Sequence, residues 1–260
     1  MATLRSSEGC PWDREQTFAS LGQFVLEEAY EVVDAIERHD IRALCEEIGD
    51  HIFEGVFLAQ IASDEGRFTV ADSLKSVSDK LVRRHPHVFR EDGRVHDAES
   101  KERAPSADAA LSKWDTQKAA EKGASGQSAS ALGELPQGLP ALLKAYKLGK
   151  RAAGVGFDWA RASDVVAKIE EEVTELRQTL GEDPSNAARA EEEMGDLLFA
   201  IANLSRKLGI EPEAALRKAN QKFTRRFQAM ESTIASSGRR LEAMTLEELE
   251  TTWQQAKQST

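Results

Sequence analysis

Two acidic segments indicate the fold of this chain: Glu171-Glu172-Val173-Thr174-Glu175 and, later, Glu193-Met194-Gly195-Asp196. An α-helix turns about 100° per residue, so side chains three residues apart lie on the same face. Each segment therefore places two carboxylates on one helical stripe, beside apolar residues such as Val173 and Leu197. The spacing predicts two amphipathic helices that pack as neighbours and bring their acidic stripes together.

The same pattern of carboxylates occurs earlier in the chain, at Glu27, Glu28, Glu31, Glu47 and Asp50. Corresponding residues lie a nearly constant distance apart: Glu172 follows Glu28 by 144 positions, and Lys222 follows Lys80 by 142. A fixed order with so little drift indicates a tandem duplication. We therefore expect an all-α protein with two helical bundle domains, at 1–120 and 134–260, joined by a flexible linker at 121–133 that is rich in Gly and Ser.

Apolar residues recur at helical spacing through most of both halves. The pattern predicts helices at about 18–38, 41–63, 70–84, 163–180, 186–208 and 212–233. Gly66, Gly181 and Gly209 are expected to end helices, and Ser163 or Asp164 to provide the N-cap of the fourth.

Composition excludes several classes of protein. The chain has 260 residues, 40% of them hydrophobic, which is enough for a core, and its formal net charge is −11. This acidic balance argues against a nucleic-acid partner. No apolar run is long enough to span a membrane, and the first residues lack the apolar segment of a secretory signal. With only two cysteines, Cys10 and Cys45, and no CxxC pair, we expect a cytoplasmic protein with free thiols.

Clustered carboxylates repel one another and resist ionisation unless a cation neutralises them. Ligands that are all oxygen favour Mg²⁺, Mn²⁺ or Ca²⁺ over softer metals. We expect one metal site at Glu172, Glu175, Glu193 and Asp196, and a possible second site at Glu28, Glu31, Glu47 and Asp50. The alternative for any one Glu-rich helix is a solvated face, but the duplicated spacing favours metal binding.

Two basic residues and a tryptophan indicate which ligand would bind beside the metal. Lys222 and Arg226 are four residues apart, so they project from one helical face and suit a polyphosphate. The alternative is a pair of surface ion pairs. Trp253 would either stack on a nucleobase or act as a buried anchor.

Several segments together resemble the MazG family of nucleoside triphosphate pyrophosphohydrolases in its tandem-domain bacterial form. They are Arg83-Arg-His-Pro-His-Val-Phe89, Gly156-Phe-Asp-Trp159, Glu192-Glu-Met-Gly-Asp-Leu-Leu-Phe199 and Lys222-Phe-Thr-Arg-Arg-Phe227. The resemblance implies an all-α, homodimeric enzyme that hydrolyses NTPs or dNTPs of varied base to the monophosphate and pyrophosphate. It implies Mg²⁺ as cofactor, with Mn²⁺ as the alternative.

The resemblance also implies site residues. It maps metal ligation onto Glu172, Glu175, Glu193 and Asp196, and nucleotide contacts onto Lys168, Glu171, Lys222, Arg226 and Trp253. Lys168 enters on the resemblance alone. Either Glu171 or Glu175 would orient or deprotonate the attacking water, and the sequence does not choose between them.

The first copy departs from the second beside its acidic residues. Phe24 and Leu26 stand where the second copy has Lys168 and Glu170. We therefore predict that the N-terminal site is weak or inactive. Two other functions stay open: a non-catalytic nucleotide or metal sensor that binds a protein partner, and a purely structural bundle.

Overall fold

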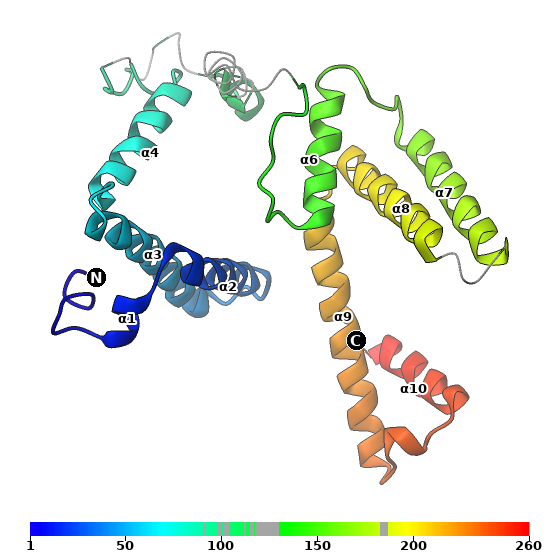
Figure 1. Cartoon of the computed structure of the whole chain (residues 1–260). Coiled ribbons are helices and arrows are strands. Elements are labelled where there is room, and N and C mark those ends of the chain that lie inside the picture. Colours follow the sequence, from blue (N-terminus) through cyan, green and yellow to red (C-terminus); the bar gives the residue numbers. More distant parts are fainter. Residues whose placement is uncertain are drawn as a thin grey trace. The chain divides into compact units, whose positions relative to one another are not determined.

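A computed structural model describes residues 1–90, 92–97, 100, 104–111, 113–114, 117, 130–182 and 187–259. Within these residues the chain is helical, apart from loops and one isolated antiparallel bridge between Phe89 and Val95. The chain divides into two compact units, Met1–Gly126 and Gln127–Thr260 (Figure 1). Most of the expected linker, residues 121–129, lies outside the described part of the chain.

The N-terminal unit is built around an antiparallel pair of long helices, as the sequence predicts. Its helices are α1 (Pro11–Glu15), α2 (Phe18–Glu37), α3 (Ile41–Asp64) and α4 (Val70–Arg84). Because only three residues connect α2 to α3, the two helices return along each other, and they share the largest contact in the unit. Leu21, Phe57 and Ile61 form its core, with Phe24 packed against them.

Local side-chain chemistry sets the ends of these helices. Thr17 and Thr69 each form a capping box at the start of α2 and α4. Asp40 accepts hydrogen bonds from two backbone N–H groups at the start of α3. Gly66 has a φ of +68°, the left-handed conformation that glycine adopts without strain after a helix end.

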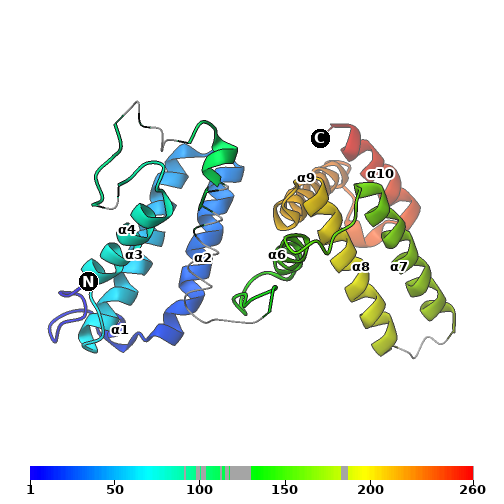
Figure 2. The same ribbon diagram turned by 90° about the horizontal axis from the view of Figure 1, so that it is seen from above.

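The C-terminal unit contains a second antiparallel pair and a separate hairpin. Its helices are α6 (Ala141–Ala153), α7 (Ala162–Glu182), α8 (Ala187–Lys207), α9 (Pro212–Ser236) and α10 (Leu246–Ser259), with a short 3₁₀ turn at Leu241–Ala243. α7 packs along α8, and α6 crosses both α8 and α9. α9 and α10 enclose a small core of Met230, Ile234 and Ala256. Figure 2 shows α7 and α8 running alongside each other.

The expected N-cap of α7 was wrong by two to three residues. The helix begins at Ala162, so Ser163 and Asp164 lie inside its first turn. Asp164 still satisfies a free donor, because its carboxylate accepts a hydrogen bond from the backbone N–H of Arg161 at 2.9 Å. It also pairs with the Arg161 guanidinium at 3.0 Å.

Long-range contacts position α6, which we did not expect from the sequence. Its N-cap residue, Pro140, offers no side-chain oxygen, and the carboxylate of Glu213 on α9 accepts from the backbone N–H of Leu142 at 3.1 Å instead. Further along, α6 meets α8 at Gly149, where an added Cβ would lie 2.3 Å from Oδ1 of Asn203. Glycine is therefore required for this close approach.

A loop between α6 and α7 is held to the end of α8. Arg206 donates to both carboxylate oxygens of Asp158, at 2.5 and 3.2 Å, and Lys207 donates to the same group at 2.7 Å. Lys207 also donates to the backbone carbonyl of Trp159. Hydrogen bonding from Arg206 lowers the pKa of Asp158 from 3.8 to about 2.

Hydropathy along the helices agrees with the absence of a long apolar run. Among the described residues, no helix is both long and apolar enough to cross a membrane. Both cysteines are free thiols; Cys10 is half-buried and Cys45 is exposed.

Candidate functional site

The two acidic segments of the C-terminal unit converge across the α7–α8 pair. Carboxylate oxygens of Glu172 and Glu175 on α7 and Glu193 on α8 all lie within 4.8 Å of one another. Glu172 is the most enclosed, with only 4% of the residue exposed, and its Oε2 is buried without a hydrogen-bond partner. We call these three residues the C-terminal cage.

Lys168 lies one turn before Glu172 and provides positive charge at the edge of the cage. Its Nζ is 2.8 Å from Glu172 and 2.9 Å from Glu171. The hydrogen bonds that Lys168 donates to Glu171 and then to Glu172 raise the pKa of Lys168, so the side chain stays protonated. The resemblance alone had suggested this residue, and the structure places it beside the acids.

Arg189 is a second cation at the cage, and the sequence analysis missed it. Its guanidinium lies 3.7 Å from Glu193, four residues further along α8. The spacing of these two residues is an ordinary helical ion pair in the sequence, so no local signal marked it as part of a site.

The electrostatics of the cage suit a divalent cation. Burial raises the pKa of Glu175, and the neighbouring charges of Glu172 and Glu193 raise it further. Lys168 offsets only part of this effect. Oxygen donors from two helices, one of them buried and unsatisfied, fit a hard divalent cation such as Mg²⁺ or Mn²⁺.

Asp196, the fourth expected ligand, is not drawn into the cage. It lies on α8 one turn after Glu193, and its side chain is exposed. Its oxygens are not among those that lie within 4.8 Å of one another. Glu171 also lies outside this group and is held by Lys168.

The expected nucleotide contacts on α9 and α10 lie apart from the cage within one chain. α9 packs against α10 and α6 and meets α8 only slightly, and Figure 1 shows it running away from the α7–α8 pair. Lys222 on α9 is exposed and Arg226 is half-buried. Trp253 on α10 packs against the ring of Phe223, with 5.2 Å between centroids, and against the core of the hairpin. Of the two interpretations of Trp253, this packing favours the anchor.

The N-terminal unit repeats the convergence with different neighbours. Oxygens of Glu28 on α2 and of Glu47 and Asp50 on α3 lie within 4.8 Å of one another, and we call these residues the N-terminal cage. Glu31 is exposed and not in this group. Burial raises the pKa of Glu28 and of Glu47, and for both the charge of Glu31 is the next cause.

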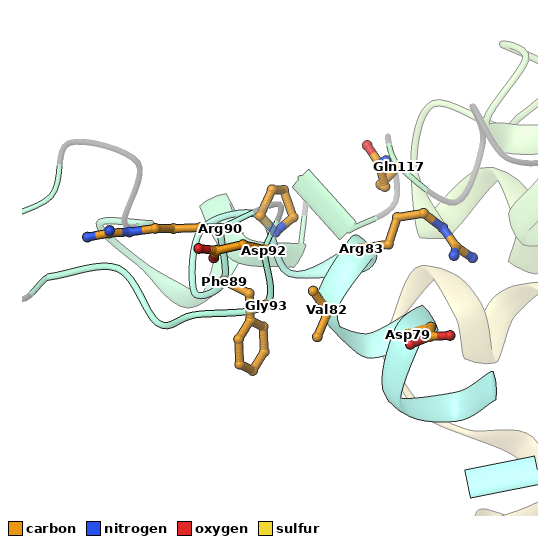
Figure 3. A pocket seen from close by; sticks show the side chains of 9 residues that line it. Asp79, Val82, Arg83, Phe89, Arg90, Asp92, Gly93 and Gln117 are labelled. Atoms are coloured by element: carbon orange, nitrogen blue, oxygen red, sulfur yellow. The ribbon is translucent and has the colours of Figure 1, made fainter. Parts of the chain in front are cut away.

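A cavity of about 540 Å³ in the N-terminal unit lies at the end of α4. Figure 3 shows Asp79, Val82 and Arg83 on α4, and Phe89 and Arg90 on the loop that follows. The side chains of Arg83 and Arg90 extend in opposite directions. They do not converge on a common anion, and none of the N-terminal cage residues lines the cavity.

Comparison with known proteins identifies the family. The profile of the MazG nucleotide pyrophosphohydrolase domain matches residues 16–89 and 162–230. The chain belongs to the MazG family. The second match contains the C-terminal cage, Lys168, Lys222 and Arg226, while Trp253 lies beyond it.

Relatives extend the MazG likeness to almost the whole chain. The nucleoside triphosphate pyrophosphohydrolase of Escherichia coli (strain K12) is 46% identical over 258 residues, which cover 99% of this chain and 94% of that protein. The nucleoside triphosphate pyrophosphohydrolase/pyrophosphatase MazG of Thermotoga maritima is 42% identical over 99% of this chain and 92% of its own length. The uncharacterized protein YabN of Bacillus subtilis is 43% identical over 98% of this chain, but the match covers 50% of YabN.

Proposed function

We propose that this chain hydrolyses nucleoside triphosphates to the monophosphate and pyrophosphate, and that the C-terminal unit performs the reaction. Mg²⁺ is the proposed cofactor, with Mn²⁺ as the alternative. Membership of the MazG family and the two full-length relatives support the activity. The observation that carries the location is the C-terminal cage, where three carboxylates, one of them buried and unsatisfied, lie next to a protonated lysine.

In this proposal Glu172, Glu175 and Glu193 hold the cation, and Asp196 joins them when substrate binds. The bound cation would supply electrostatic stabilisation of the charge that develops on the phosphate oxygens. Lys168 is fixed by Glu171 and Glu172 with its ammonium at the edge of the cage, where it would meet a phosphate oxygen.

We propose different roles for Glu171 and Glu175, between which the sequence did not choose. Glu175 contributes to the converging oxygens, which supports a role as ligand. Glu171 lies outside them, exposed and oriented by Lys168, which supports a role in orienting the attacking water. We therefore propose that Glu171 orients the attacking water and that Glu175 binds the cation.

Titration of Mn²⁺ in parallel with pyrophosphate release tests this assignment. Glu175→Gln should weaken Mn²⁺ binding and turnover together, whereas Glu171→Gln should lower turnover and leave Mn²⁺ affinity near that of the wild type. Glu191→Gln is the matched control, because it removes the same charge from an exposed position outside the cage. Loss of Mn²⁺ affinity in Glu171→Gln with none in Glu175→Gln would reverse the two roles.

We infer that the active form is a homodimer in which a second copy completes each site. Lys222 and Arg226 lie on a helix that runs away from the cage of their own chain. The same helix exposes apolar side chains, with Leu216 at 47% and Phe223 at 57%, and α8 exposes Leu198 and Phe199. Apolar faces of this kind are typical of subunit interfaces. Docking of two copies would bury them and bring Lys222 to the partner's cage.

Complementation between two inactive variants tests this arrangement. Glu193→Gln removes a ligand from the cage, and Lys222→Ala removes the positively charged side chain on α9. If the site forms between chains, an equal mixture after subunit exchange should recover roughly a quarter of wild-type turnover, because half the dimers are mixed and each has one intact site. If both residues act within one chain, the mixture should stay inactive. Light scattering would report the dimer independently of activity.

A further inference from the structure

The two units differ in the segment that ends their third long helix. By the offset of 142 positions between the two copies, Pro86 corresponds to Gln228. α9 continues past this position to Ser236, whereas α4 ends at Arg84, because a proline and the residue before it do not continue a helix. The described residues between His85 and Asp97 form a loop instead. The N-terminal unit therefore has a structural feature that its duplicate lacks.

Hydrogen bonds within this loop fix its shape. Phe89 and Val95 form an isolated antiparallel bridge. The backbone N–H of His96 donates to the carbonyl oxygen of Val88 at 2.9 Å. Gly93 turns the chain between the two sides of the bridge, with a φ of +79° that glycine adopts without strain. A loop held by its own hydrogen bonds presents a wall that exists before any ligand binds, as in most small-molecule sites.

This loop and α4 line the cavity of about 540 Å³ described above (Figure 3). Its volume lies in the range of roughly 300–1,000 Å³ that is typical of small-molecule sites. Val82 from α4, together with Pro86 and Phe89 from the loop, provides apolar lining. The cavity therefore offers a ligand an aromatic ring and two aliphatic side chains on which a flat apolar face can pack.

Two aspartates and two arginines also line the cavity: Asp79 and Arg83 on α4, and Arg90 and Asp92 on the loop. The arginines extend in opposite directions and are matched by the acids, which disfavours a polyphosphate. Among the residues that the structure describes, these aspartates do not belong to a group of carboxylates close enough to hold a metal. Four charged groups likewise disfavour a purely apolar ligand. The lining suits an uncharged ligand whose edge both donates and accepts hydrogen bonds.

We propose that this cavity binds a purine base, either free or as its nucleoside. The ring system would pack on the apolar lining, with Phe89 as the stacking partner. An aspartate carboxylate accepts hydrogen bonds from the amino and ring N–H groups of a base, and an arginine donates to the N7 and O6 acceptors of a purine. The site is separate from both cages, and its occupation does not depend on hydrolysis by the C-terminal unit.

Equilibrium dialysis of the full chain against guanosine tests the site. Guanosine has no phosphate, so its binding is measured without turnover. Asp79→Asn and Asp92→Asn should each weaken binding by about tenfold, the value of one hydrogen bond to a charged group. Asp34→Asn is the matched control. It removes a carboxylate from an exposed i,i+4 ion pair with Arg38 on α2, as Asp79→Asn does from the pair with Lys75 on α4.

Further titrations identify the ligand and its location. Uridine should bind at least about tenfold more weakly than guanosine, because a single ring covers less apolar surface. Tighter binding of inosine than of hypoxanthine would assign the nucleoside as ligand, and equal binding the free base. Glu172→Gln should bind guanosine as the wild type does. Loss of guanosine binding in Glu172→Gln would place the ligand at the C-terminal cage and overturn the proposal.

Thermal melting of each variant separates a lost contact from misfolding. Asp79→Asn and Asp92→Asn should melt close to the wild-type temperature, since both residues are exposed and asparagine keeps an acceptor oxygen. Equal guanosine affinity in the wild type and both variants would overturn the proposal. So would a wild type that binds none of guanosine, inosine and hypoxanthine. Pyrophosphate release reports on the C-terminal unit, so the failure of one proposal is visible apart from the other.

Discussion

The two units carry the same acidic motif on the same pair of helices, yet they surround it with opposite chemistry. The C-terminal cage has Lys168 within 2.8 Å of Glu172 and Arg189 beside Glu193. The N-terminal cage has Phe24 and Ala43 at those positions, and the buried Glu54 behind it. The carboxylates explain why both cages suit a divalent cation. Under the proposed function, their neighbours make the C-terminal cage the one that receives the triphosphate, because a polyanion needs cations near it.

Disabling one cage at a time should show most clearly which unit performs the hydrolysis. Glu172→Ala should lower pyrophosphate release by about a hundredfold or more, since loss of an outer partner of a metal ligand already costs 10–100-fold. Glu28→Ala should leave the rate within about twofold, because its cage lacks the cations for phosphate. Steady-state kinetics at saturating Mg²⁺ measures both. If only Glu28→Ala abolished turnover, the assignment of the catalytic unit would be reversed.

Replacing Lys168 by the residue of the N-terminal unit tests whether the lysine beside the cage accounts for the difference between the units. Lys168→Phe gives the C-terminal cage the residue of the N-terminal one and should lower kcat/KM by roughly 10–100-fold, the value of one charge-assisted contact. Lys168→Arg should retain more activity, because it keeps the charge. Circular dichroism would confirm that the helices persist. Equal rates for Lys168→Phe and wild type would show that this lysine does not contact substrate.

A substitution at the α6–α8 contact tests whether the units unfold separately. Gly149→Ala places a Cβ 2.3 Å from Oδ1 of Asn203, so we expect it to destabilise the C-terminal unit by about 1–3 kcal/mol. The N-terminal unit should melt as before. Differential scanning calorimetry would resolve two transitions, of which one shifts. Asn203→Ala added to Gly149→Ala should recover part of the loss, because it removes the clashing oxygen.

The smallest expected effect concerns the loop that Asp158 holds to α8. Its pKa is lowered from 3.8 to about 2, so its stabilising contribution is present above about pH 4 and is lost as pH falls through 2. Asp158→Asn should cost roughly 1 kcal/mol at pH 7, with allowance for solvent screening. Urea unfolding at pH 7 and pH 2.5 measures it. The penalty should shrink at the lower pH, and a penalty that grew there would contradict the ion pair.

The cages of the metal-free protein should respond to pH with the opposite sign. The pKa of Glu28 is raised by burial and then by neighbouring carboxylates, so the folded state favours the protonated group. Its contribution to stability is therefore present at low pH and lost as pH rises through the raised pKa. Glu28→Gln in EDTA should flatten this dependence.

Much of the fold was predictable because helix formation is local. Apolar periodicity and capping residues predicted the bounds of α2, α3, α4 and α8 to within one residue. α6 was missed because the group that caps it is Glu213, 71 positions later in the chain. Ser163 and Asp164 indicated the start of α7 to within a few residues. Asp164, however, lies inside the helix and accepts a hydrogen bond from the backbone N–H of Arg161.

The candidate site was predictable only in part. Helical spacing identified the acids that converge, Glu172, Glu175 and Glu193, because three-residue spacing fixes a common face. Their roles as ligands stay a prediction. Spacing alone could not separate Asp196, which remains exposed, from those that converge. It also could not show that α9 carries Lys222 away from the cage of its own chain, because the direction of a helix depends on packing.

Spacing along the chain was enough to predict that this protein is helical, that its plan is duplicated and that acidic residues share faces of neighbouring helices. Which of those acids are buried depends on how the helices pack. In the sequence Glu54 is one more glutamate on an acidic helix, but in the folded N-terminal unit only 8% of it is exposed. Burial depends on residues distant in the chain, and a buried carboxylate is costly unless it is protonated, hydrogen-bonded or paired with a cation.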